Sequence, residues 1–150
     1  MEILRSVLRE LPEFQQLLAA LDSGQSPAAV SGLAAVHRAH FAACLGQESG
    51  RPVVVVCADE GEAERMARDL SFLTGGEVPV LAARSFLFHN IATVSRQWEH
   101  RRLRLLYRLT RGEVPCLVAT VEALLQRTLP PEALERACAA LAVGQTADLE

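Results

Sequence analysis

The chain has 150 residues, of which 50% are hydrophobic and 22% are charged, and its formal net charge is −3. This size and composition are typical of one globular domain and exclude a disordered or fibrous protein. All 15 basic residues are arginines, because the sequence contains no lysine. The lack of lysine excludes Schiff-base catalysis and removes the lysine that contacts the β- and γ-phosphates in a Walker A loop. The mildly acidic balance argues against a surface that attracts nucleic acid everywhere, so any such contact is expected to be local.

The cysteines lie far apart and form no C-x-x-C pair; they are Cys44, Cys57, Cys116 and Cys138. This pattern predicts reduced, buried thiols in a cytoplasmic protein. The first residues lack the charged segment and apolar core of a signal peptide, and no apolar run approaches the ~20 residues of a membrane span. We therefore expect neither export nor membrane insertion.

The N-terminal third of the chain has the residue pattern of helices. Apolar side chains at helical spacing over residues 2–21 predict one amphipathic helix, or two short helices that meet at Pro12. Turn-forming residues over 22–27 predict a linker. A second helix is expected over about residues 28–45.

Strands and helices alternate in the rest of the chain. The continuous apolar run at 53–58 predicts a strand that is covered on both faces of a parallel sheet. Two shorter strands are expected at 78–82 and 115–119. Helices should follow the first strand directly and then occupy residues 95–111, 121–127 and 131–141. This order predicts a mostly parallel α/β sheet, and three strands are few for such a fold, so we expect an incomplete domain.

The first strand ends at Asp59 and Glu60, which has two interpretations. An apolar strand followed by an acidic pair has the form of a Walker B segment, which could hold Mg²⁺ and orient water. The favoured interpretation is a capping box, in which Asp59 caps the next helix and Glu62, three residues on, returns the hydrogen bond. A phosphate-binding loop should precede a Walker B strand, but the segment before this one has Gly32 alone and no G-x-x-x-x-G-K-[ST] spacing. A single glycine does not form a nest of backbone amides.

The histidines give no strong signal for catalysis or metal binding. His37 and His40 lie three residues apart on the second expected helix, and without a third ligand they are best interpreted as helix-surface residues. His89 and His100 belong to no nucleophile-base pattern. The loop after the second strand contains Phe86 and Phe88, which either line a binding crevice or cover the edge of the sheet.

The helix expected over 95–111 carries a stripe of arginines. At 100° per residue, four of them fall within about 80° of arc; they are Arg101, Arg104, Arg108 and Arg111. This face could contact phosphates, but it is better explained as a solvated face or as a surface that pairs with acidic residues of a neighbouring domain. Arg102 projects from the apolar side of the helix, where its guanidinium should meet a carboxylate or backbone carbonyls.

Several short segments together resemble the N-terminus of the bacterial transcription-repair coupling factors (Mfd), over about residues 26–150. The most specific segment is Ala123-Leu-Leu-Gln-Arg127, with Pro130 and Pro131 after it. The other segments are Gly50-Arg-Pro-Val-Val-Val-Val56, Asp59-Glu-Gly-Glu-Ala-Glu64 with Asp69-Leu70, Val94-Ser-Arg96, Arg102-Leu103, Val118-Ala-Thr-Val-Glu122, and Gly144-Gln145 with Asp148-Leu149.

In that family the N-terminal module is similar to the excision-repair protein UvrB. It contains a P-loop-NTPase-like α/β core, domain 1a, that has lost its nucleotide site, and an inserted domain 2 that docks UvrA. The resemblance implies a helical extension over residues 1–25, a partial domain 1a over 26–141 and the start of domain 2 over 142–150. It also implies that ATP and Mg²⁺ bind in motor domains elsewhere in the full protein, and that this chain has no catalytic, cofactor-binding or metal-binding residues.

The sequence therefore predicts an incomplete, P-loop-like α/β domain that serves as a scaffold and has no catalysis of its own. Its expected partners are other domains of the same polypeptide, UvrA mainly through domain 2, and RNA polymerase and DNA through other domains, with no membrane. Two alternatives stay open. One is a fragment of an ATP-dependent helicase or nucleotide hydrolase that uses Asp59 and Glu60, and the other is a small DNA-binding module that uses the arginine helix.

Overall fold

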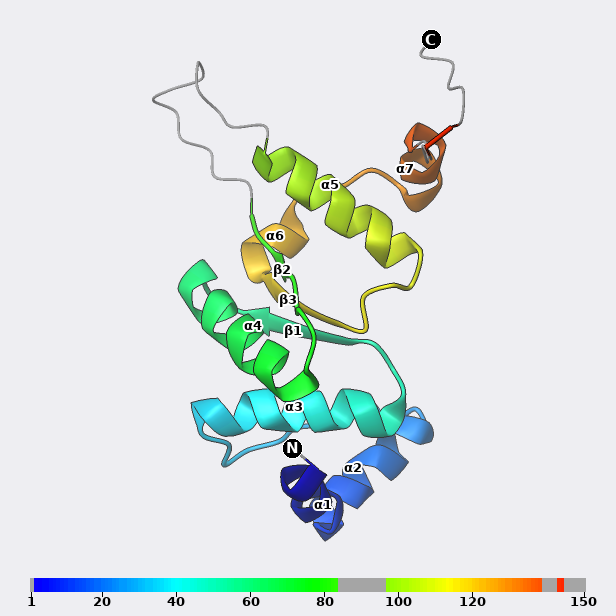
Figure 1. Ribbon diagram of the computed structural model, residues 1–150. Coiled ribbons are helices and arrows are strands. Elements are labelled where there is room, and N and C mark those ends of the chain that lie inside the picture. Colours follow the sequence, from blue (N-terminus) through cyan, green and yellow to red (C-terminus); the bar gives the residue numbers. More distant parts are fainter. Residues whose placement is uncertain (1, 84–96, 139–142, 145–150) are drawn as a thin grey trace.

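The computed structural model describes residues 2–83, 97–138 and 143–144, and side chains from residue 6 onward. Helices and strands alternate from β1 to β3 and are shown in Figure 1. The elements are α1 (Glu2–Arg9), α2 (Pro12–Asp22), α3 (Ala35–Ser49), β1 (Val53–Cys57), α4 (Glu60–Thr74), β2 (Val80–Leu81), α5 (Gln97–Thr110), β3 (Cys116–Thr120), α6 (Val121–Leu125) and α7 (Pro131–Ala137). None of the helices in these ranges is long and apolar enough to span a bilayer.

The three strands form one parallel sheet in the order β1-β3-β2. β1 pairs with β3 along five residues, from Val53 opposite Cys116 to Cys57 opposite Thr120, and β2 pairs with β3 at two positions. Helices α3 and α4 cover one face of the sheet, and α5 covers the other (Figure 1). The expected parallel α/β architecture is confirmed.

Each face of the sheet has its own hydrophobic core. On the α3/α4 face, Val118 of the central strand packs with Leu70 and Ala39, all fully buried. On the α5 face, Leu117 and Ala119 pack with Leu105. Both cores therefore depend on β3, which is buried at all five positions.

The expectation that residues 53–58 form a strand covered on both faces is wrong for one face. Val54 and Val56 are 52% and 50% exposed, whereas Val53 and Val55 pack against the α3/α4 core. The reason is strand order: β1 lies at the edge of the sheet and β3 lies at its centre. A continuous apolar run indicates burial, but it does not say where in the sheet the strand lies.

The first expected helix is divided at Pro12 into α1 and α2, as one of the two interpretations predicted. Proline is well placed there because it occupies the first turn of α2, where no backbone donor is needed. The helix expected over 28–45 begins only at Ala35, since Gly32 has a φ of +81° and Ala34 is extended. It continues to Ser49, and Gly50 ends it in the left-handed conformation.

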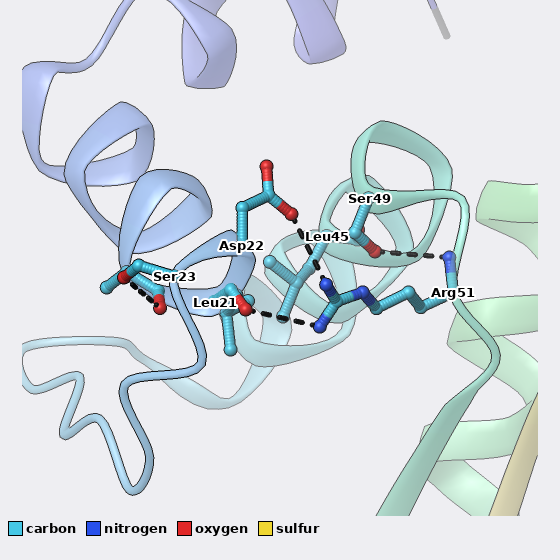
Figure 2. A network of polar contacts seen from close by, with 7 residues as sticks. Leu21, Asp22, Ser23, Leu45, Ser49 and Arg51 are labelled. Carbon is cyan, nitrogen blue, oxygen red and sulfur yellow. Dashed lines mark hydrogen bonds and ion pairs between the residues drawn. The ribbon is translucent and has the colours of Figure 1, made fainter.

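The N-terminal helices are attached to the core through α3. The rings of Phe14 and Phe41 meet edge to face with centroids 5.5 Å apart, and Arg9 pairs with Glu48 at 3.2 Å. Arg51, just before β1, donates to the carbonyl of Leu21 and the carboxylate of Asp22 (Figure 2). These contacts make the helical extension a packed part of the domain.

The C-terminal helices differ slightly from expectation. α7 ends at Ala137, because Cys138 is extended, and the rest of the range expected to be helical lies outside the described residues. Cys138 is exposed, so the prediction of four buried thiols is wrong at this position and confirmed at Cys44, Cys57 and Cys116. No disulfide joins them: all four thiols are free.

Candidate functional site

The acidic residues after β1 form a helix cap. The side chain of Asp59 accepts a hydrogen bond of 2.8 Å from the backbone amide of Glu62, and the carboxylate of Glu62 accepts one of 3.1 Å from the amide of Ala58. The N-cap by Asp59 that the spacing predicted is confirmed, and the return bond from Glu62 differs from a standard capping box in reaching the amide of Ala58, one residue before the cap. Glu60, in the first turn of α4, is exposed. One carboxylate oxygen of Asp59, Oδ1, is thus engaged by the backbone.

Metal-binding chemistry finds no support in the parts of the chain that the structure describes. Those parts contain no group of three or more His, Cys, Asp or Glu side chains placed to hold an ion. His37 is exposed on α3, whereas His40 is half-buried with its Nε2 3.4 Å from the Sγ of Cys44. The surface interpretation is therefore right for His37 and only partly right for His40, which packs against a buried thiol.

The segment before α3, where a phosphate-binding loop would lie, is open and irregular. Gly32 is exposed, and a Cβ placed on it would have no atom within 4 Å. The N-cap residue of α3, Ala34, makes no side-chain capping bond, and the first turn of the helix has no acidic residue. The geometry provides one isolated glycine ahead of an uncapped helix, without the lysine of a Walker A loop.

The thiol of Cys57, at the end of β1, is buried and unreactive at neutral pH. Cys57 is 4% exposed, and burial raises its pKa, with the carboxylates of Glu62 and Asp59 raising it further. Burial also raises the pKa of Cys116, at the start of β3. Because the thiolate is the nucleophile, both groups are held in their unreactive, protonated form at neutral pH.

The arginine stripe on α5 divides into two parts. Arg111 donates to Glu113 at 2.8 Å and lies 5.8 Å from the centre of the Tyr107 ring, so its charge is engaged locally. Arg101 and Arg104 are exposed and Arg108 is half-buried, and none of the three has an ion pair or hydrogen bond to the described residues. As far as the described residues show, these three arginines are the part of the predicted stripe that is available to a partner.

Arg102 is a structural residue, as its position on the apolar side predicted. Its guanidinium donates to the carbonyl of Ala82 at 2.9 Å and to the carbonyl of Ala123 at 3.2 Å, and it lies 5.7 Å from the centre of the Trp98 ring. Partial burial lowers its pKa. Of the two partners that the sequence left open, it takes backbone carbonyls, and it thereby links α5 to the end of β2 and to α6.

A cavity of about 830 Å³ lies at the amino ends of the strands. Its walls are mostly apolar and come from the end of α3 and the start of β1, from the residues between α4 and β2, and from the end of α5 and the start of β3. The sequence did not reveal it, because its lining comes from three separate stretches with no shared motif, at 42–54, 74–78 and 109–117. The loop with Phe86, Phe88 and His89, which was the sequence candidate for a crevice, lies outside the described residues.

Comparisons with known proteins agree with the resemblance seen in the residues. The chain is 28% identical over 132 residues to the transcription-repair-coupling factor of Bacillus subtilis, and 33% identical over 143 residues to that of Myxococcus xanthus. The alignments include 87% and 90% of this chain, but only 11% and 12% of those proteins. No family model and no solved structure matches. The chain is therefore related to one region of the transcription-repair-coupling factors, of whose length it spans about a tenth.

Proposed function

We propose that this chain is a non-catalytic scaffold domain of a transcription-repair-coupling factor, with a P-loop-like core similar to domain 1a of UvrB. The observation that carries the proposal is the capping box: Asp59 and Glu62 use their carboxylates to satisfy the backbone at the start of α4. The lone Gly32 and the lack of lysine support it independently. In this proposal Asp59 and Glu62 serve the fold, and the loop around Gly32 does not hold a nucleotide.

The scaffold would hold other domains of the same polypeptide in position. In the proposed arrangement, residues 1–25 form a helical extension, 26–141 the core, and 142–150 the start of the module that recruits UvrA. RNA polymerase, DNA, ATP and Mg²⁺ would bind to other parts of the longer protein. The packing of α2 on α3 through Phe14 and Phe41, and the ion pair of Arg9 in α1 with Glu48 in α3, support an extension that belongs to the core.

An equilibrium titration with labelled ATP in the presence and absence of Mg²⁺ tests this function. We expect no saturable binding by the 150-residue chain. An intact P-loop ATPase in the same assay serves as the positive control, and an Asp59→Asn variant of this chain should behave like the unmodified chain. Saturable, magnesium-dependent binding in the micromolar range, lost in the variant, would support the alternative of a nucleotide hydrolase that uses Asp59 and Glu60.

A second candidate function is nucleic-acid binding through α5, favoured by the three arginines that lack partners among the described residues. Phosphate contacts by Arg101, Arg104 and Arg108 would each add a salt-dependent increment to affinity. Replacing all three should then weaken binding to duplex DNA and reduce the slope of log K against log salt by about three. Replacing Arg38 of α3 with Arg65 and Arg68 of α4, all three exposed, supplies a control with an equal change in charge. A chain that binds no duplex at low salt refutes this candidate.

A further inference from the structure

The cavity at the amino ends of the strands has the size and the lining of a small-molecule site. Its volume of about 830 Å³ falls within the roughly 300–1,000 Å³ of ligand pockets in proteins. Its walls are mostly apolar, with Val53, Val78, Leu109 and Leu117 among the lining residues. Such pockets hold the hydrocarbon part of a ligand, while a few polar or charged groups select its head group. The charges around this cavity therefore indicate which head group it accepts.

Helices α3, α4 and α5 all end at this cavity. The lining includes the last turn of α3, Thr74 at the end of α4 and Leu109 near the end of α5. The carboxyl end of a helix carries a partial negative charge, because its last carbonyls have no partner within the helix. Neither α3 nor α4 has a basic residue in its last turn to counter that charge, whereas α5 has Arg108. The ends of α3 and α4 therefore favour a positive charge at the cavity.

The charged side chains of the lining have the same preference. They are Arg51 and Glu77. The guanidinium of Arg51 is directed to α2, where it lies 3.4 Å from the carboxylate of Asp22 and donates to the carbonyl of Leu21 (Figure 2). The carboxylate of Glu77 is exposed and has no ion pair or hydrogen bond to the described residues. The charge that the lining leaves free for a ligand is therefore the negative one.

We propose that this cavity binds a small apolar molecule that carries one positive charge, of the class of the arylalkylamines. The apolar walls take up the hydrocarbon part, and the ammonium group lies near Glu77 and the ends of α3 and α4. A single arginine or lysine side chain of a partner protein has similar chemistry, but it would fill only a small part of 830 Å³. The site lies at the opposite end of the sheet from Asp59, so the proposal is independent of whether the chain binds a nucleotide.

Titration of the isotope-labelled chain with diphenylpropylamine, followed by amide chemical shifts, tests the site. Saturable shifts are expected at Gly46, Gly76 and Gly112, which line the cavity from three separate stretches, and not at Gly32 or Gly61, which lie outside the lining. Diphenylpropanol and diphenylpropanoate keep the two rings and replace the positive charge. Both should bind at least about tenfold more weakly than the amine. No saturable shift with the amine, or equal affinity for the three compounds, would overturn the proposal.

A pair of charge variants tests the role of Glu77. Glu77→Gln removes the free carboxylate with little change in shape, and it should weaken binding of the amine about threefold to fivefold while leaving the affinity for the alcohol unchanged. The control Glu64→Gln removes the same charge from an exposed residue of α4 outside the lining, and it should change neither affinity. Equal effects of the two variants on the amine would overturn the proposal. Shifts at the three lining glycines that follow protein concentration without any amine would also overturn it, because a second copy of the chain would then occupy the cavity.

Discussion

The two ends of the sheet are built in opposite ways. At the carboxyl ends of the strands, polar side chains are engaged with the backbone: Asp59 and Glu62 cap α4, Thr120 caps α6 by accepting from the amide of Ala123, and Arg102 donates to two carbonyls. At the amino ends lies an apolar cavity of about 830 Å³. Parallel α/β proteins bind their ligands at the carboxyl ends. Among the described residues at that end, the polar groups serve helix caps and backbone carbonyls.

The largest effect is expected at Arg102, on the carboxyl side. Arg102→Ala should lower the free energy of unfolding by about 2 kcal/mol, because it removes a charged donor from the carbonyls of Ala82 and Ala123. Arg101→Ala, next to it but exposed, should change stability by less than about 0.5 kcal/mol. Urea unfolding of both variants measures the difference. Equal stability of the two would mean that the carboxyl end is not held together by Arg102.

On the amino side, the next largest effect is expected at Gly46, where α3 approaches β1 closely. A Cβ at this position would lie 2.7 Å from Cγ2 of Val53, so one of the two must move. Gly46→Ala should cost about 1.5 kcal/mol, since the steric cost exceeds the gain in helix propensity. Gly76→Ala is the control, because a Cβ there meets nothing within 4 Å. If Gly46→Ala is more stable than the unmodified chain, the contact with Val53 is relieved at little cost, which would contradict this prediction.

A smaller loss is expected at the capping box. Asp59→Ala should lower the free energy of unfolding by about 1 kcal/mol through loss of the N-cap, while Asp59→Asn, which retains an acceptor, should lose only a few tenths. Thermal unfolding with and without Mg²⁺ measures both. The loss should be the same in either condition. A stability that rises with Mg²⁺ in the unmodified chain and not in Asp59→Ala would assign Asp59 to a metal instead.

The smallest effect is a pH dependence from Cys57. Because burial raises its pKa in the folded chain, the thiol ionises first in the unfolded chain, whose pKa is about 9. Its contribution to stability is therefore complete below that pH and is lost as the pH rises above it, by about 1 kcal/mol or less at pH 10. Comparing unfolding at pH 8 and pH 10 for the unmodified chain and Cys57→Ser should show a smaller decrease in the variant. An identical decrease would mean that other groups cause it.

The sequence predicted the features that depend on local spacing. The cap at Asp59 follows from residues a few positions apart. The same kind of pattern offered a break at Pro12 as one of two possibilities, and it placed Arg102 on the apolar side of its helix with carbonyls as one of two possible partners. Features that depend on strand order were wrong or missed. The central position of β3, the exposure of Val54 and Val56 and the apolar cavity arise from segments distant in sequence, which no periodicity reports. The late start of α3 depends on the left-handed conformation of Gly32.

The most direct test of the scaffold role is to map amide chemical shifts of the isotope-labelled chain during addition of ATP with Mg²⁺. We predict no saturable shift at Gly32, at the first turn of α3 or at Asp59. The carboxylate of Asp59 already caps α4, and the lone Gly32 before α3 does not form a phosphate-binding nest of amides. Saturable shifts that converge on Gly32 and Asp59 would place a nucleotide at the carboxyl ends of the strands and contradict the account.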